Sequence, residues 1–445
     1  MSRPPQYPQT GTANIELSGA LGAGADRGRL PTGAGGGWLA RWLAATSDLA
    51  ELHAHNPLLD AVIDEIDGRR IRIADRWLVD FASCNYLGLD LDQQVIAEIP
   101  AYLERWGTHP GWSRMLGSPI LYQQLETRLT ELLGAPDTLL LQTLTHIHAA
   151  VIPVLADDGT IFVDARAHKT IYDGCTIARA HGATIQRFAH NDPDDLERLL
   201  RHRPAAPRLV CMDGINSMTG NPPQLAAFTR LARDYDALLY VDDAHGFGVV
   251  GERRPDEPCP YGRRGNGVVC YLGETYDNLI LTAGLSKAYS SLLAFVTCPP
   301  SLKRLLKVTA PPYLYSGPSP VASLASALIG LQVNQARGDQ LRAGLYRKTR
   351  RILDHLDQLG AATLNTSAFP IIEVPLANPD ALNQVGQFLF DHGIYVTLAF
   401  YPGVPRDEVG FRLQVTAAHT DDQVDQLLAV LDELATTFPL RTSRP

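Results

Sequence analysis

The 445-residue sequence has no dense block of lysine and arginine, and its formal net charge is -9. This balance provides no electrostatic footprint for a phosphate backbone, so a nucleic-acid partner is not expected. No apolar run reaches the roughly 18 residues that a membrane-spanning helix needs. The N-terminal stretch MSRPPQYPQT also lacks the apolar core of a secretory signal. We therefore expect a cytoplasmic protein without a membrane segment.

Signals for disulfides and metals are also weak. The cysteines are scattered, without a CxxC pair, which indicates reduced and mostly buried thiols. They are Cys84, Cys175, Cys211, Cys259, Cys270 and Cys298. His146 and His148 stand two positions apart on a predicted helix and should point to different faces, which disfavours a shared metal with His168.

The N-terminal quarter divides into two predicted segments. Residues 1–36 are rich in glycine, alanine, proline and polar residues, and they carry too few apolar side chains to offset the entropy lost on ordering. A disordered tail is therefore predicted there. In residues 37–95, apolar positions from Trp38 onward recur at helical spacing and predict an amphipathic helix. The stretch 61–83 alternates like a β-hairpin with Asp-Gly at its turn.

The remaining chain predicts an α/β architecture. In residues 96–317, helical patterns alternate with short apolar strands such as TIFVD, RLVCMD and ALLYVDD, which favours a mainly parallel sheet covered by helices. Residues 318–445 contain two long helical patterns, further strand patterns and a final helix from Thr420. They predict a smaller α+β C-terminal domain. The Pro/Gly/Arg-rich stretch 252–267 predicts a long loop, for which a functional role and a solvated insertion are equally plausible.

Two polar clusters follow predicted strands. The strand ALLYVDD ends in Asp242 and Asp243, which Ala244 and His245 follow directly. Lys287 lies just after the strand NLILTA. Ligands of α/β sheets bind beyond the carboxyl ends of the strands, so both clusters fall on the binding edge. A lysine amine and a nearby acid suit a pyridoxal cofactor, since the amine forms an imine and the acid keeps the pyridine nitrogen protonated.

Eight motifs then occur in a fixed order along the chain. They are NYLG (85–88), GTHPGWSR (107–114), AHKTIYDG (167–174), RFAHND (187–192), INSMTGN (215–221), VDDAHGFGVVGE (241–252), LSKA (285–288) and RLQVTAAHT (412–420). Together they resemble the α-oxoamine synthases, a family that includes 8-amino-7-oxononanoate synthase, 2-amino-3-ketobutyrate ligase, 5-aminolevulinate synthase and serine palmitoyltransferase. The resemblance implies the aspartate aminotransferase-like fold of fold-type I enzymes that depend on pyridoxal 5′-phosphate (PLP).

The resemblance also implies roles for the residues that match around the cofactor. Lys287 forms the Schiff base with PLP and, once released by the amino acid, moves the Cα proton. Asp242 pairs with the pyridine nitrogen, and His168 stacks on the ring. His245 and Ser217 hydrogen-bond the phenolic oxygen.

Further matched positions concern the phosphate and the amino acid substrate. Arg412 corresponds to the arginine that binds the substrate carboxylate with a two-pronged ion pair. Asn85 lies near that carboxylate in the family. Ser286 beside the lysine, Leu144 at the family's phosphate-cup glycine, and the Thr145 hydroxyl are the remaining cofactor-binding candidates.

Several positions depart from the family pattern. TLTHIH (143–148) replaces the usual Ser-Gly followed by small residues, and Gly284 replaces the threonine before LSK. Leu293 and Ala294 replace a glycine pair, and SGP (316–318) replaces the STS motif of the neighbouring subunit. These changes cluster at phosphate and acyl-substrate positions, so they leave the acyl donor open.

The implied activity is that of a homodimeric acyltransferase. It condenses an amino acid with an acyl thioester, carried by coenzyme A or an acyl carrier protein, and releases carbon dioxide to give an α-amino ketone. An alternative is the same cofactor with another reaction, namely transamination, decarboxylation or a non-thioester condensation. A catalytically idle partner subunit is disfavoured because Lys287, Asp242 and His245 are all retained.

Overall fold

The computed structural model describes residues 47–442 except residues 203 and 205. The predicted tail (1–36) and the start of the helix predicted from Trp38 lie outside these residues. The described chain begins with helix α2 (Ser47–His55). Residues His55–Pro445 group into one compact unit, which contains all the sheets described below.

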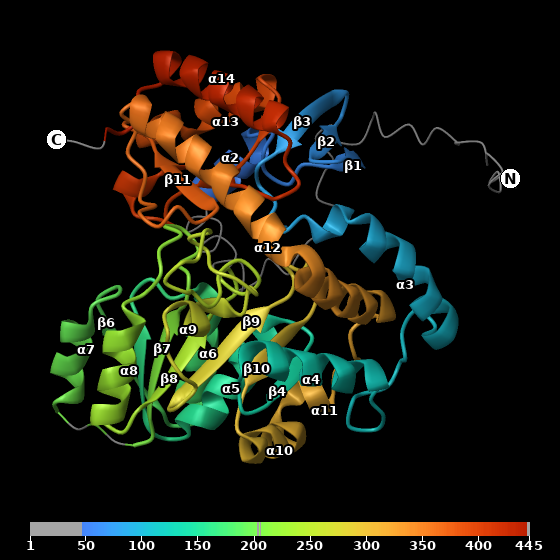
Figure 1. Ribbon diagram of the computed structural model, residues 1–445. Helices are drawn as coiled ribbons and strands as arrows, with labels where there is room; N and C mark the ends of the chain where they lie inside the picture. Colours follow the sequence, from blue (N-terminus) through green and yellow to red (C-terminus); the bar gives the residue numbers. More distant parts are fainter. Residues whose placement is uncertain (1–46, 203, 205, 443–445) are drawn as a thin grey trace, which may run out of the picture. The chain divides into compact units, whose positions relative to one another are not determined.

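A seven-stranded sheet lies at the centre of the half drawn in green, yellow and teal in Figure 1, with the order β4-β10-β9-β8-β7-β5-β6. β10 is antiparallel to both of its neighbours and every other pair in the sheet is parallel, so the predicted mainly parallel sheet is confirmed. The strands are β4 (Thr138–Leu141), β5 (Thr160–Asp164), β6 (Thr184–Phe188), β7 (Arg208–Asp213), β8 (Leu238–Asp242), β9 (Leu279–Gly284) and β10 (Ala294–Thr297).

The inner strands of this sheet are short apolar runs because both of their faces are buried. Ile161 and Val163 of β5, and Leu209 and Cys211 of β7, pack in one apolar cluster with helices α5 (Leu144–Ala156) and α6 (Lys169–Ala180). The residues between them, such as Phe162, alternate to the opposite face and are also buried. Burial on both faces fixes the strand ends, where the polar residues of interest begin.

Helices connect the strands and lie on both sides of the sheet (Figure 1). Some begin at a capping residue whose side chain accepts backbone N–H groups, as Asp192 does for α7 (Pro193–Leu200). They are α3 (Gln93–Trp106), α4 (Ile120–Leu133), α5 (Leu144–Ala156), α6 (Lys169–Ala180), α7 (Pro193–Leu200), α8 (Leu225–Asp234), α9 (Gly267–Tyr271), α10 (Pro300–Thr309) and α11 (Pro311–Leu314), preceded by the 3-10 turn η1 (Leu89–Leu91).

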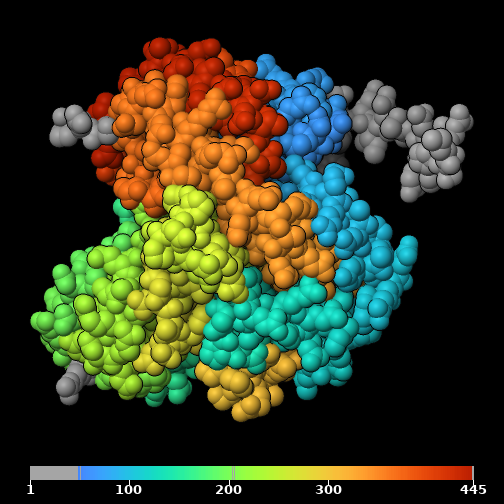
Figure 2. Space-filling model, in the orientation of Figure 1, coloured from blue at the N-terminus to red at the C-terminus, as the bar shows by residue number. Residues whose placement is uncertain are grey.

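The prediction of two long helices after residue 318 is wrong, because a single helix, α12 (Val321–Gln358), spans 38 residues. Its sequence contains no proline, and its glycines weaken a helix without ending it. At Gly338 a Cβ atom would lie 2.3 Å from the side-chain oxygen of Asn334, so this glycine makes room for close packing. The first half of α12 packs on α3 and α4, and its orange surface lies beside the cyan surface of α3 in Figure 2.

Asp92 is expected to stabilise the contact between α3 and α12. Its carboxylate caps α3 by accepting from the backbone nitrogens of Gln94 and Val95, and it also pairs with both terminal nitrogens of Arg337 on α12 at 2.6 and 2.9 Å. Asp92→Ala should lower the free energy of unfolding by about 1–2 kcal/mol, measured by denaturant titration. Asp92→Asn, which keeps a capping oxygen, should lose less; an equal loss would contradict the capping role.

Two smaller sheets complete the compact unit (Figure 1). β11 (Ile371–Pro375), β14 (Gly410–Gln414) and β13 (Thr397–Ala399) form an antiparallel sheet in that order, and α13 (Leu382–Asp391) and α14 (Asp421–Thr437) accompany it. The predicted hairpin is confirmed, with Gly68 in its turn at φ 59°, and a third strand extends it. That sheet comprises β1 (Ile63–Asp67), β2 (Arg70–Ile73), β3 (Arg76–Asp80) and β12 (Ile394–Tyr395). The short 3-10 turns η2 (Pro379–Ala381) and η3 (Arg406–Glu408) precede α13 and β14 in the sequence.

The seven-stranded sheet falls wholly within the predicted segment 96–317, and the antiparallel sheet within 318–445. The domain boundaries themselves stay predictions. Among the described helices, none combines the length and the apolar character that crossing a bilayer would require.

Candidate active site

Charged residues stand at the carboxyl ends of four neighbouring parallel strands. Asp164, Asp213 and Asp242 are the last residues of β5, β7 and β8, and Lys287 follows the end of β9 by three residues. Asp213 and Asp242 are direct partners in the register of β7 and β8. The predicted location of the functional residues at this edge is therefore found in the structure.

A cavity of about 200 Å³ opens at this edge and brings together eight of the ten residues predicted from sequence. These eight are Lys287, Ser286, Asp242, His245, His168, Ser217, Leu144 and Thr145, and they are accompanied in the lining by Thr143, Thr170, Asp213, Ile215 and Ala244. Residues up to 144 positions apart in the sequence, Thr143 and Lys287, thus line the same cavity. Arg412 and Asn85 do not line it.

Asp242 is held by a chain of buried side chains. Its Oδ2 atom lies 3.0 Å from Nε2 of His148, whose Nδ1 lies 2.8 Å from the hydroxyl of Tyr240. An ionised carboxylate can only accept, so Nε2 of His148 donates to Oδ2 of Asp242. The other oxygen, Oδ1, accepts from the backbone nitrogen of Ala244 at 3.0 Å. These contacts fix the orientation of the carboxylate.

Asp242 stays ionised despite its burial. Burial alone would raise its pKa, but the hydrogen bond from His148, the electrostatic interaction with His148 and the positive charge of Lys287 lower the pKa below the usual value. A fixed carboxylate of this kind can keep a protonated ring nitrogen charged. His148 was considered in the sequence only as a metal ligand beside His146. In the structure these two histidine side chains lie in different surroundings: His148 is fully buried, whereas His146 contacts Thr143.

His245 is neutral and its ring is fixed by Tyr86. The hydroxyl of Tyr86 lies 2.7 Å from Nδ1 of His245. Burial, followed by the charges of Lys287 and Arg412, lowers the pKa of His245 well below its usual value, while burial raises the pKa of Tyr86 well above 10. With the protonated tyrosine donating to Nδ1, the ring keeps its proton on Nε2 and can donate from there.

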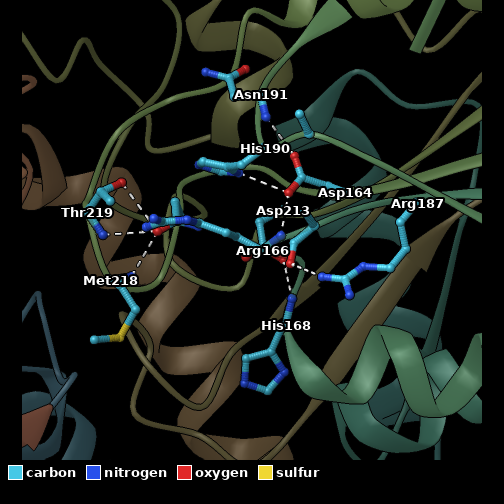
Figure 3. Close-up of polar contacts among 12 residues, drawn as sticks. Asp164, Arg166, His168, Arg187, His190, Asn191, Asp213, Met218 and Thr219 are labelled. Carbon is cyan, nitrogen blue, oxygen red and sulfur yellow. Dashed lines mark hydrogen bonds and ion pairs between the residues drawn. The ribbon is translucent and has the colours of Figure 1, made fainter. Parts of the chain in front are cut away.

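His168 enters the cavity from the start of α6. Its Nδ1 lies 2.7 Å from the hydroxyl of Thr170. Its backbone nitrogen donates to Oδ1 of Asp213 at 3.0 Å (Figure 3). Burial lowers the pKa of His168, and the charge of Lys287 lowers it further, although the charge of Asp242 acts in the opposite direction. The net shift is downward, so the ring is neutral near pH 7. The nearby Asp164 orders the adjoining loop by accepting from the backbone of Asn191 at 2.9 Å, as Figure 3 also shows.

Arg412 lies on β14, beside the cavity rather than in its lining. Its Nη1 donates to the backbone carbonyl of Ser217 at 2.7 Å. In the amide orientation that satisfies its neighbours, the Gln414 oxygen accepts from Nη2 and Nε of Arg412 at 2.8 and 2.7 Å. The guanidinium is therefore hydrogen-bonded to a residue of the cavity wall. Its positive charge contributes to lowering the pKa of both His168 and His245.

Asn85 is placed differently from the other predicted residues. Its side-chain amide donates to Oδ2 of Asp90 at 2.9 Å, and Asp90 also pairs with Arg69. Its predicted role near the substrate carboxylate stays a prediction.

In the loop 252–267, Arg263 and Arg264 each form an ion pair with Glu252 at 3.2 Å, so both charges already have a partner within the chain.

The cavity fits the chemistry of PLP at each of its functional groups. Helix α5 begins in the lining, where the Thr143 side chain caps it, and the N-terminus of a helix offers backbone N–H groups that suit an anion. The hydroxyls of Thr145 and Ser286 can supplement these donors for a phosphate. The Lys287 amine suits the aldehyde, and the ionised Asp242 suits the pyridine nitrogen.

A model of the family named aminotransferase class I and II matches residues 77–431. The chain belongs to this family. It is 32% identical to the 8-amino-7-oxononanoate synthase of Methylobacillus flagellatus over 84% of this chain and 91% of that protein. It is 30% identical to the serine palmitoyltransferase of Caulobacter vibrioides over 81% of this chain and 87% of that protein. The Sphingomonas wittichii serine palmitoyltransferase structure matches with a TM-score of 0.81 and 26% identity, covering 90% and 98% of the two chains.

These similarities confirm the predicted family resemblance, the fold-type I architecture and PLP as the cofactor. The enzyme is therefore a PLP-dependent transferase. Sequence reasoning missed the supporting roles of His148, Tyr86 and Asp213. Tyr86 lies within the NYLG motif, which offered a signal. The contact from His148 to Asp242 joins residues 94 positions apart and had no local signature.

Proposed function

We propose that this enzyme catalyses the decarboxylative condensation of an amino acid with an acyl thioester to give an α-amino ketone. The observation that carries the proposal is the cavity that joins Lys287 and the fixed carboxylate of Asp242, with Arg412 tied to its wall. The names of its relatives, 8-amino-7-oxononanoate synthase and serine palmitoyltransferase, support this class of reaction.

Each residue has a task in the reaction. PLP, when bound, supplies the electron sink that stabilises a carbanion at the Cα atom of the amino acid. Lys287 holds the cofactor and then takes the Cα proton at its Nζ. Asp242 keeps the ring nitrogen protonated, and His245 donates to the phenolic oxygen from Nε2. Arg412 orients the substrate carboxylate.

The only further reactant needed is a proton from solvent. The Cα carbanion attacks the thioester carbonyl, a carbon-carbon bond forms, and the carbon-sulfur bond breaks to release a thiolate, which takes that proton. Loss of the carboxylate as carbon dioxide breaks the second bond, and a proton returned from Lys287 to the same carbon completes the amino ketone. A neighbouring copy of the chain is proposed to complete the site, in keeping with the SGP segment at the family's neighbouring-subunit motif.

The reaction class is tested by offering the purified enzyme with PLP a panel of amino acids and acyl-coenzyme A esters. Thiol release and carbon dioxide from carboxyl-labelled amino acid should appear in equal amounts, with both depending on both substrates. The same esters on an acyl carrier protein identify the carrier. Formation of an oxo acid without thiol would assign transamination instead, and carbon dioxide without thiol would assign simple decarboxylation.

A further inference from the structure

Glu373 on β11 is a buried acid to which neither the sequence motifs nor the reaction assigns a role. Its side chain is 0% exposed, and neither carboxyl oxygen has a hydrogen-bond partner among the described residues. An unpaired carboxylate in such a place is strongly disfavoured unless it is neutral or finds a cation. The position therefore suits a carboxyl group that can change between its neutral and its charged form.

Arg412 lies directly opposite Glu373. The two residues are partners in the antiparallel register of β11 and β14, which places both side chains on the same face of the sheet. The same guanidinium donates to the carbonyl of Ser217 in the cavity wall. Glu373 thus stands behind the residue proposed to bind the substrate carboxylate.

Three charged groups face Glu373, from three different elements. They are Arg412 on β14, Glu408 on η3, and Arg166 in the loop after β5. Arg166 is already paired with Glu408 through two hydrogen bonds of 2.9 and 2.6 Å. Burial and then the charge of Glu408 raise the pKa of Glu373 to about 8, although Arg412 and Arg166 act in the opposite direction. The acid is therefore mostly neutral well below pH 8 and mostly an anion well above it.

We propose that Glu373 is a positioning residue that decides whether Arg412 can bind a carboxylate substrate. As a neutral acid it leaves the guanidinium available, and as an anion it pairs with Arg412 across the two strands and competes with the substrate. The inference rests on the proposed function, in which Arg412 anchors the amino acid carboxylate.

The expected effect follows from the fraction of enzyme with neutral Glu373. Binding is unaffected well below pH 8 and weakens above it, because the anion accumulates as the pH rises. At pH 9 only about a tenth of the enzyme keeps the neutral acid, which raises the apparent dissociation constant about tenfold. The KM for the amino acid should rise by a similar factor while kcat at saturation changes little, since the lost interaction is one of binding.

The direct test uses propanoate, a carboxylate without an amine that would itself titrate in this range. Its dissociation constant is measured by calorimetry from pH 7 to pH 9.5 on the enzyme with PLP, for the wild type, Glu373→Gln and Glu373→Leu. The ratio of the wild-type constant to either variant's constant should be about one at pH 7 and about ten at pH 9. A ratio that does not change with pH overturns the inference.

Arg412→Gln separates this inference from the proposed function. If it binds propanoate as tightly as the wild type at pH 7, Arg412 is not the carboxylate anchor and both proposals lose that step. If it loses affinity while the Glu373 variants keep the wild-type pH profile, only the role of Glu373 is refuted. Loss of affinity in Arg412→Gln together with a flat profile in both Glu373 variants supports both proposals.

Discussion

Lys287→Ala is expected to lower kcat by at least about a thousandfold, because the substitution removes both the amine that holds the cofactor and the base that takes the Cα proton. Lys287 lies past the end of β9 in the lining of the cavity, outside the buried core. The protein should remain folded. The measurements are the rate of thiol release and the visible absorbance of lysine-bound PLP, and both should be lost together.

The matched control is Lys169→Ala, since Lys169 lies one position beyond His168 and its side chain is 78% exposed. It pairs with Asp173 on the surface of α6, and exposed ion pairs of this kind contribute little. Activity and absorbance should stay within about twofold of the wild type, as for most surface substitutions. If Lys287→Ala kept full condensing activity, the assignment of this cavity as the active site would be wrong.

The fold was largely predictable because its strong signals are local. β5, β7 and β8 are short apolar runs bounded by polar residues, and a strand buried on both faces reads this way in any sequence. The division of the region after residue 318 into two helices failed because glycines such as Gly338 look like breaks. In the structure the helix passes through Gly338, which lets Asn334 approach closely.

The site was predictable where the chain itself brings chemistry to strand ends, as at Asp242 and Lys287. The supporting contacts were not predictable, because they depend on distant elements meeting in space. Tyr86 reaches His245 across 159 positions. Glu373 reads in sequence as an ordinary strand residue, and only its complete burial and its register opposite Arg412 distinguish it. Asn85 carries a matching motif, yet its side chain is engaged by Asp90.

Asp242→Asn tests whether the carboxylate tunes the cofactor. Asparagine keeps the shape and can still bond to the backbone of Ala244, but it cannot hold a proton on the ring nitrogen by charge. Loss of one preorganised electrostatic contact of this kind should lower kcat by about 10²- to 10³-fold. The KM for the amino acid should change much less, because Arg412 is untouched. Asp256→Asn, at an exposed position in the loop 252–267, is the control and should leave kcat unchanged.

His148→Ala extends this test to the residue that holds Asp242. Removing the imidazole leaves Oδ2 of Asp242 and the hydroxyl of Tyr240 without their present partner. The hydrogen bond and the electrostatic interaction with His148, which lower the pKa of Asp242, would be lost, so its pKa should rise. A carboxylate with a raised pKa is protonated as the pH falls, so the variant should lose kcat progressively toward acidic pH and approach the wild type in alkaline solution. A loss of kcat that is the same at every pH would instead assign His148 a packing role alone.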